Sequence, residues 1–306
     1  MIKLDRTIIS CPNCSNQKFS EFGKQIHFNY ELNYVICQSC TLIFMQPQMS
    51  TDALTKFYQN EYRILYQDSE KPTETLIATQ TIRAEHLALF FITNSSYSSN
   101  DFFNYLDIGC STGVHLDAIK KKFPNAKMFG VEPGDKFREY SIKKGHTVFK
   151  SLDDFKESGI KADAICLSHV LEHIPEPIDF LKLVNNVSSK KAFLIIEVPN
   201  TLGGHLSFEL AHPLCFYSNS LINTCELAGF GAKKIFEHSV TSKYKLPCYL
   251  LGFFQKSVNS SVHQIALSFQ QVIEKRRKSL KDVERTVLRL RIKRKLKNVI
   301  NKFKIH

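Results

Sequence analysis

Between residue 101 and about residue 256, short apolar runs alternate with stretches in which apolar residues recur at helical spacing. The runs are rich in β-branched and aromatic residues and predict strands, whereas the stretches between them predict helices. Strands are expected at Tyr105–Ile108, Met128–Val131, His146–Phe149, Asp163–Leu167 and Phe193–Val198, with helices near 114–122, 135–144, 153–157 and 177–187.

This alternation predicts an α/β fold with a parallel sheet that is covered by helices on both faces. A loop follows residue 200, and a helix at Ser220–Ala228 precedes two strand-like runs, Ala232–Val240 and Cys248–Gln255. Because no long helix separates these runs, we expect them to form an antiparallel pair at the edge of the sheet.

Three segments flank this domain, which we place at residues 100–256. Residues 1–50 form a small cysteine-bearing module, and residues 51–99 form a connector with helices at Thr51–Asn60 and Pro72–Thr93. In the tail, residues 257–306, apolar residues from Val262 and Ala266 onward step by three and four, are interrupted at Arg276 and resume on a shifted phase at Ile292. This spacing predicts a long amphipathic helix.

The charge of the chain is concentrated in that tail. The 306 residues are 43% hydrophobic and carry a formal charge of +12, and residues 271–306 contain 14 basic residues but only three acids. The rest of the chain is therefore near neutral, which argues against a protein that coats nucleic acid.

Three interpretations of the basic helix remain open. It could pack on its own domain or on a second copy, or it could bind an anionic membrane surface. Nucleic acid is less favoured because no aromatic residues are interleaved with the charges. The chain has no apolar stretch of the roughly 20 residues that span a bilayer and no signal peptide at its start, so we expect a cytoplasmic protein, peripheral at the inner membrane face if the tail binds lipid.

The first module contains two C-x-x-C pairs, Cys11 with Cys14 and Cys37 with Cys40. Each pair brings two thiolates toward one ion, and four thiolates complete a tetrahedral zinc site. Such a site has no open position for water, so we expect a structural zinc ion. The alternative is a module with four ordinary cysteines.

The main candidate for ligand binding is the segment Leu106-Asp107-Ile108-Gly109-Cys110-Ser111-Thr112-Gly113, which joins a predicted strand to a predicted helix. Gly109 permits a tight turn, and Gly113 permits close approach of helix and ligand. Glu132 follows the next strand, where a carboxylate can accept hydrogen bonds from both hydroxyl groups of a ribose. Together these residues predict a nucleotide site.

This segment resembles the first motif of class I S-adenosylmethionine (SAM)-dependent methyltransferases, with serine in place of the middle glycine. A second resemblance is Ser168-His169-Val-Leu-Glu172-His173, which is similar to the segment that follows the fourth strand in those enzymes. The resemblance implies a Rossmann-like seven-stranded sheet that ends in the antiparallel pair. It also implies a set of cofactor-binding residues: Asp107, Gly109, Cys110, Ser111, Gly113, Glu132, Pro133, Asp153, Ser168 and His169.

Asp153 has an equally supported alternative role as the N-cap of a helix. The catalytic base is expected among four histidines, because histidine titrates near neutrality: His169, His173, His205 and His212. We favour His212 and His173. The segment around His212 resembles the acceptor region of sugar methyltransferases, and the four-cysteine module before a methyltransferase domain resembles enzymes of bacterial polysaccharide and deoxysugar pathways.

Related carbon methyltransferases have a His-Glu-His triplet where this chain has His212-Pro213-Leu214, so methylation of a sugar or glycan hydroxyl is favoured. An RNA-modifying methyltransferase and a non-catalytic SAM-binding scaffold are alternatives. Two further motifs point elsewhere. The segment Gly109–Gly113 also fits the nucleophile elbow of α/β hydrolases, and His169–His173 fits a zinc-peptidase pattern that requires one continuous helix.

Overall fold

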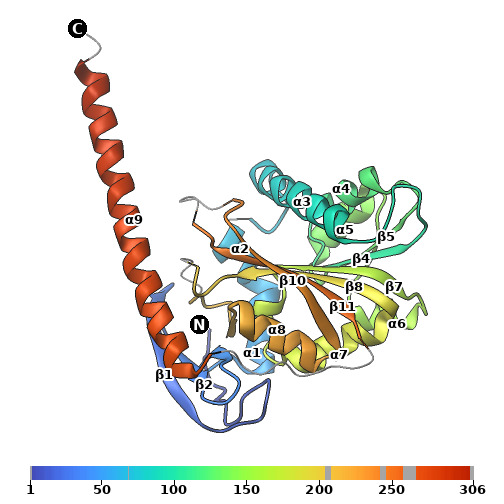
Figure 1. Cartoon of the computed structure of the whole chain (residues 1–306). Helices are drawn as coiled ribbons and strands as arrows, with labels where there is room; N and C mark the ends of the chain where they lie inside the picture. Colours follow the sequence, from blue (N-terminus) through green and yellow to red (C-terminus); the bar gives the residue numbers. More distant parts are fainter. Residues whose placement is uncertain (1, 68, 204–207, 242–245, 258–266, 304–306) are drawn as a thin grey trace.

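A computed structural model describes residues 2–67, 69–203, 208–241, 246–257 and 267–303 of the chain (Figure 1). Its centre is a seven-stranded sheet with the strand order β10-β11-β8-β7-β4-β5-β6. The five consecutive strands from β8 to β6 are parallel, whereas β11 is antiparallel to β8 and β10 is antiparallel to β11. This arrangement confirms the predicted α/β Rossmann-like fold and its terminal antiparallel pair.

The strands of this sheet are β4 (Asn104–Ile108), β5 (Lys127–Val131), β6 (Thr147–Phe149), β7 (Ala162–Ser168), β8 (Ser188–Pro199), β10 (Phe230–His238) and β11 (Tyr249–Lys256). The helices between them are α4 (Val114–Lys122), α5 (Asp135–Lys143), α6 (Leu152–Glu157), α7 (Pro177–Val187) and α8 (Ser218–Leu227). A short 3-10 helix, η1 (Leu171–His173), follows β7. The predicted elements therefore lie within a few residues of their observed bounds.

Two apolar cores lie on opposite faces of the sheet. Leu106 and Ile108 of β4 belong to the core under α6, α7 and α8, whereas Tyr105 of the same strand belongs to the core under α3 (Glu74–Asn94) and α4. Alternate side chains of one strand thus enter different cores, as the two-residue period of a strand requires. Both faces are buried, which explains the almost continuous apolar runs of the central strands.

The cysteine module forms a second sheet that depends on a distant part of the chain. Strands β1 (Phe19–His27), β2 (Tyr30–Cys37) and β3 (Ile43–Met45) are joined by β9 (Leu214–Cys215), which pairs with β3. The loop after β8 therefore returns to the N-terminal module and is fixed there. The sequence does not predict β9, because a strand of two residues has no periodic pattern.

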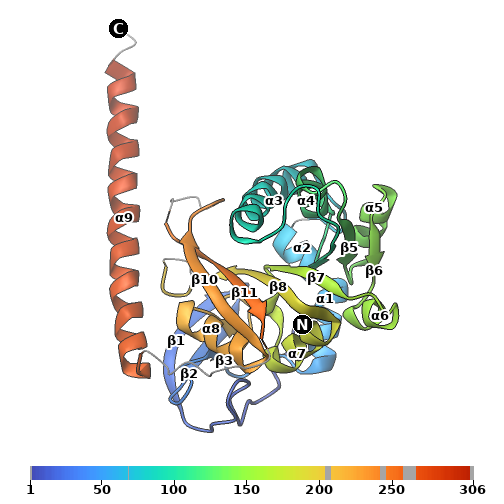
Figure 2. The ribbon, with the colours of Figure 1, turned by 45° about the vertical axis from the view of Figure 1, so that its right-hand side comes forward.

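The C-terminal helix α9 (Phe269–Phe303) touches the body only near its start. Val272 is fully buried, and Arg276 donates a hydrogen bond to the carbonyl oxygen of Thr201 while its guanidinium lies 5.4 Å from the centre of the Phe208 ring. The helix then extends away from the body (Figures 1 and 2). Arg276, which interrupts the apolar pattern, is thus an anchor, and Val262 and Ala266 lie outside the described residues.

The connector contains α1 (Thr51–Asn60), as predicted, and a short helix that the sequence pattern did not reveal, α2 (Tyr62–Gln67). Ser50 caps α1 by accepting a hydrogen bond from the amide of Ala53. None of the helices in the described part of the chain combines the length and the apolar content that a membrane span requires.

Candidate functional site

The glycine turn between β4 and α4 has the backbone conformation that its sequence predicts. Gly109 and Gly113 have φ angles of +79° and +76°, in the left-handed region that favours glycine. A Cβ atom at Gly109 would lie 2.6 Å from a methyl carbon of Val170, and one at Gly113 would lie 2.5 Å from the hydroxyl of Ser141. A side chain at either position would therefore disturb the turn as well as strain it.

Glu132 follows β5 and lies against this turn. Its Oε2 accepts a hydrogen bond of 3.0 Å from the amide of Ser111, and its Oε1 accepts one of 2.8 Å from the amide of Gly134. The guanidinium of Arg63 in α2 donates a third hydrogen bond, of 3.0 Å, to Oε1. The structure thus brings the predicted turn and the predicted ribose carboxylate together, and it adds an arginine that the sequence did not indicate.

Helix α3 covers the outer side of the turn. The amide nitrogen of Gln80 donates a hydrogen bond of 3.0 Å to the hydroxyl of Ser111, and the hydroxyl of Thr112 donates one of 2.6 Å to the amide oxygen of Gln80. The Cys110 side chain is buried, and a Cβ atom on Gly130 would lie only 2.5 Å from its sulfur. Its thiol therefore fills the core, so only the backbone of Cys110 belongs to the turn.

Asp107 lies buried at the carboxyl end of β4, together with His115 of α4. The two side chains are 3.4 Å apart, and the other ring nitrogen of His115 lies 3.3 Å from the hydroxyl of Tyr105. Pro133 follows Glu132 directly, and its carbonyl oxygen accepts a hydrogen bond from Arg138. Of the predicted cofactor set, these residues lie at or beside the turn.

Asp153 is exposed in the first turn of α6. The alternative prediction that Asp153 caps the helix is wrong. Ser151 is the cap: its hydroxyl accepts a hydrogen bond from the amide of Asp154, and the Asp154 carboxylate accepts one from the amide of Ser151. This reciprocal capping box satisfies backbone groups at the N-terminus of α6.

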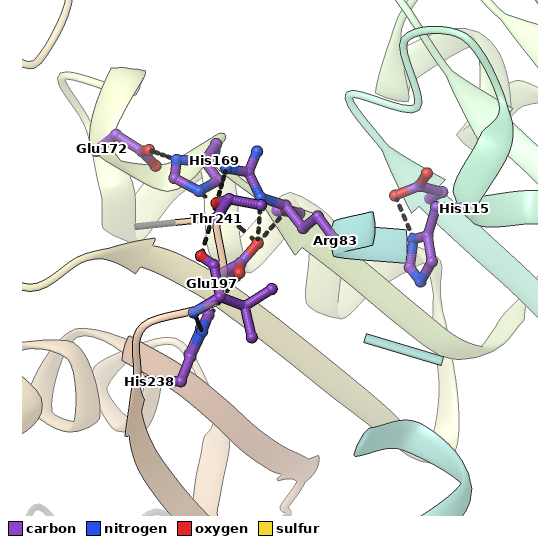
Figure 3. A network of polar contacts seen from close by, with 10 residues as sticks. Arg83, His115, His169, Glu172, Glu197, His238 and Thr241 are labelled. Carbon is purple, nitrogen blue, oxygen red and sulfur yellow. Dashed lines mark hydrogen bonds and ion pairs between the residues drawn. The ribbon is translucent and has the colours of Figure 1, made fainter. Parts of the chain in front are cut away.

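A buried polar network lies at the carboxyl ends of β7 and β8 (Figure 3). Its centre is Glu197 of β8, whose Oε2 accepts a hydrogen bond of 2.5 Å from the Ser168 hydroxyl and lies 3.5 Å from Nε of Arg83. Its Oε1 lies 3.2 Å from Nε2 of His238. Burial alone would raise the pKa of Glu197, but the hydrogen bond from His238 and the charge of Arg83 reverse this effect and hold the pKa well below its usual range.

His169 lies between two carboxylates of this network. Its Nδ1 is 3.1 Å from Oε1 of Glu172 and its Nε2 is 3.7 Å from Oε2 of Glu197. Burial, with a contribution from the charge of Arg83, lowers the pKa of His169 to about 3. Its φ angle of +55° is unusual for a residue other than glycine and is a form of backbone strain that accumulates at functional sites.

The two predicted catalytic histidines lie side by side, with ring centres 4.8 Å apart. Nδ1 of His173 is 2.8 Å from the carbonyl oxygen of Ala211, and burial lowers the pKa of His173 to about 4. The hydroxyl of Tyr34, in the cysteine module, donates a hydrogen bond of 2.7 Å to the carbonyl oxygen of His212. The module therefore helps to position the loop that carries His212. His205, another candidate base, lies outside the described residues.

The four cysteines of the N-terminal module converge as their spacing predicts. The sulfur atoms of Cys11 and Cys40 are 3.3 Å apart, and those of Cys14 and Cys37 are 3.6 Å apart. A tetrahedral zinc site with Zn–S bonds of about 2.3 Å has S···S edges of about 3.8 Å, whereas a disulfide has a bond of about 2.05 Å. The thiol set therefore fits a zinc ion.

Another set of possible metal ligands, His86, Glu197 and His238, is better described as part of the polar network around Glu197. The amide of Val240 donates a hydrogen bond of 3.4 Å to Nδ1 of His238, so the proton of a neutral ring lies on Nε2, facing Glu197. A protonated nitrogen cannot be a metal ligand.

The structure also excludes the hydrolase and zinc-peptidase interpretations of these motifs. The strand before Gly109 is the first strand of the large sheet, whereas the nucleophile elbow of a hydrolase follows several strands of its sheet. His169 precedes η1 and His173 ends it, so the two histidines do not share one continuous helix. Both alternatives are therefore rejected.

A family profile described as a methyltransferase domain matches residues 73–231, which is just over half of the chain. The chain belongs to this methyltransferase family. Its central domain has the class I fold of SAM-dependent methyltransferases, and the motif around Gly109 stands where that fold places the cofactor. A search of curated proteins found no match.

Among solved structures, the domain is similar to the plantazolicin methyltransferase BpumL in complex with a triazolic analogue and S-adenosylhomocysteine (SAH). The identity is 15%, the TM-score is 0.50, and the match covers 67% of this methyltransferase and 94% of BpumL. A SAM-dependent methyltransferase from Archaeoglobus fulgidus is 19% identical over 60% of this chain and 100% of that one, with a TM-score of 0.47.

A candidate O-methyltransferase from Nostoc punctiforme is 16% identical, with a TM-score of 0.44. That match covers 57% of this chain and spans only 56% of the Nostoc chain. At these identities the solved structures show the fold and leave the substrate open.

The residues of the turn fit SAM as a cofactor. A buried carboxylate, Glu132, stands beside a glycine turn with no side chains at positions 109 and 113, which suits the approach of a nucleoside. SAM would supply an electrophilic methyl group on a sulfonium sulfur.

Proposed function

We propose that the protein transfers a methyl group from SAM to a hydroxyl of a sugar, nucleotide sugar or glycan, with His173 as the base. The observation that carries this proposal is the hydrogen bond between Nδ1 of His173 and the carbonyl oxygen of Ala211. A carbonyl oxygen only accepts, so Nδ1 carries the proton of the neutral ring. Nε2 of His173 is then the basic nitrogen.

The lowered pKa of His173 keeps its ring neutral near pH 7, which is the form that accepts a proton. Methyl transfer is an in-line displacement, so the protein has to orient the acceptor hydroxyl and remove its proton. His173 would take that proton at Nε2, and the neighbouring His212 and the buried Glu172 set the polarity around it. Glu132 and the glycine turn would hold the cofactor.

Aromatic rings beside His173 support a sugar as the acceptor. Tyr62 and Tyr58 have ring centres 5.7 and 6.1 Å from that of His173, and Tyr66 stacks on Tyr62 with ring centres 5.0 Å apart. The Tyr58 hydroxyl and Oε2 of Glu172 are buried without a hydrogen-bond partner among the described residues. Unpaired buried polar atoms are costly, and the hydroxyl groups of a sugar would satisfy them.

The test is turnover with labelled SAM against nucleotide sugars, lipid-linked glycans and RNA, with product analysis by mass spectrometry. We expect methylation of a glycan hydroxyl, and we expect His173→Asn to abolish turnover while SAH affinity is retained. Cofactor binding with no turnover on any acceptor would favour a scaffold. Turnover on RNA, with salt-dependent affinity, would favour an RNA-modifying enzyme.

Two further parts of the proposal concern the ends of the chain. We infer that the four cysteines hold a structural zinc ion, because their sulfur atoms already lie at distances close to the edges of a tetrahedral site. We also propose that the basic helix α9 binds an anionic membrane surface, where lipid-linked glycans would be presented. Self-association through α9 is the competing outcome.

A further inference from the structure

The ribose carboxylate Glu132 already has almost all of its hydrogen-bonding capacity in use. A carboxylate offers about four lone-pair positions. Three are taken: the amide of Ser111 binds Oε2, and the amide of Gly134 and the guanidinium of Arg63 bind Oε1. A ribose presents two hydroxyl donors, so one of these partners has to leave before Glu132 can bind both hydroxyl groups.

Arg63 is the partner that can leave. The amides of Ser111 and Gly134 belong to the backbone of the pocket itself, whereas Arg63 reaches in from α2 with a long side chain. Arg63 also covers the carboxylate, because the Glu132 side chain is 3% exposed while that of Arg63 is 21% exposed. The guanidinium carbon lies 3.8 Å from the centre of the Phe137 ring in α5, a cation–π contact that holds the arginine in place.

The helix that carries Arg63 also contacts the proposed acceptor site. Tyr62 packs edge-on against His173, and the Tyr66 hydroxyl accepts a hydrogen bond of 3.1 Å from the amide of Ala211. Ala211 is the residue whose carbonyl oxygen fixes the tautomer of His173. A six-residue helix thus links the carboxylate of one site to the base of the other.

We propose that Arg63 is a positioning residue that occupies the ribose site of the empty enzyme, and that cofactor binding displaces it and moves α2 against the acceptor site. This inference rests on the proposed function. The arginine takes the place of the ribose hydroxyl groups as a donor to Glu132. Its release frees α2, so that Tyr62 and Tyr66 adjust around His173 only after the cofactor is bound. The cofactor is then the first ligand to bind.

The first test is calorimetric binding of SAH to the full chain and to two variants. Arg63→Leu keeps an apolar stem and removes the donors to Glu132, so it should bind SAH about three- to tenfold more tightly than the wild type, because a charge-assisted hydrogen bond no longer competes. Lys136→Leu is the matched control. It removes a cation that pairs with Glu70 nearby and does not touch Glu132, so its affinity should be unchanged.

The second test uses hydrogen exchange of the wild-type protein and does not depend on any variant. SAH binding should accelerate exchange of the Ala211 amide, because α2 carries away its hydrogen-bond partner, the Tyr66 hydroxyl. Exchange of the amides in Tyr62–Gln67 should also accelerate, because this six-residue helix loses the contact between Arg63 and Glu132 that holds it in place. Ordinary ligand binding would protect them. Weaker or unchanged SAH binding by Arg63→Leu, or protection of α2, would overturn the displacement while leaving the proposed function intact. Failure of the wild type to bind SAH would overturn both.

Discussion

His169, His173 and His212 are near one another in the structure but have different environments. His169 is enclosed by Glu172, Glu197 and Arg83 within the buried network, whereas His173 has one nitrogen fixed by a backbone carbonyl group. Both ring nitrogens of His169 thus face carboxylates, whereas His173 has Nε2 available for the proposed role as base. The sequence indicates all three as candidate bases and favours His212 and His173, but only the surrounding residues in the structure show how their environments differ.

The pH dependence of the reaction tests the role of His173. For the proposed base His173 the neutral ring is the form that accepts a proton, and burial lowers its pKa from the ordinary histidine value of 6.5 to about 4. Protonation of His173 should abolish activity. Activity should therefore be retained as the pH falls through 6.5 and should decline only as the pH approaches 4. The measurement is kcat/KM against pH with the acceptor found by screening, since this ratio reports the free enzyme. An acidic limb near pH 6.5 would exclude His173 and favour a more exposed base.

Glycine and carboxylate positions were predictable because their chemistry is local. Gly109, Gly113 and Glu132 each follow a strand, and their spacing along the chain fixes their place in the fold. Arg63 and Glu197 were not predictable. Their contacts come from elements that are distant in the sequence, so the partners of a charged residue at the end of an apolar run or in a short helix are known only from the folded structure.

At the scale of elements, the cysteine module is structurally tied to the loop that carries His212. Strand β3 pairs with β9, and the Tyr34 hydroxyl of β2 donates to the carbonyl oxygen of His212 and also lies 3.0 Å from that of Glu209. The sequence predicted the metal ligands and the seven-stranded sheet, since both have a repeating pattern. It did not predict β1, β2 and β9 as one sheet, because β1 has no buried residue and β9 has only two residues, which leaves the alternating buried positions of β2 without a recognisable partner.

This connection gives a prediction for zinc removal. Cys11→Ser should release the zinc ion, lower the thermal stability and increase proteolysis of the loop before β9, because the module can no longer hold β3 against β9. The checks are metal analysis and limited proteolysis. Cys225→Ser, in a buried cysteine outside the module, is the control and should retain the metal. Full metal retention by Cys11→Ser would refute the four-thiolate site.

At the scale of the whole molecule, the positive charge and the candidate cofactor site lie in different parts of the protein. The large sheet carries the site, whereas α9 extends away from it and carries most of the positive charge (Figure 2). Nine lysines and arginines follow Glu284, and no acid does. Two such helices side by side would repel each other, which favours an anionic surface over a second copy.

A truncation after Glu284 tests this arrangement, because it keeps Val272 and Arg276 and removes the acid-free part. The full chain should sediment with vesicles of phosphatidylcholine and phosphatidylglycerol, and salt should weaken this binding. The truncated chain should stay in solution at equal SAH affinity, and neither should bind phosphatidylcholine alone. Binding that survives truncation would contradict the role of α9, and a concentration-dependent dimer lost on truncation would indicate self-association.

The pairing of β3 with β9 also determines how the polypeptide can be divided. A cut in the polar segment 95–100 separates a fragment that holds the four cysteines from one that holds the large sheet, yet each fragment would lose a strand partner that the other contributes. We therefore expect neither fragment to fold alone and both to reassemble when they are co-expressed. The unit that folds independently would then include the cysteine module as well as the matched methyltransferase domain.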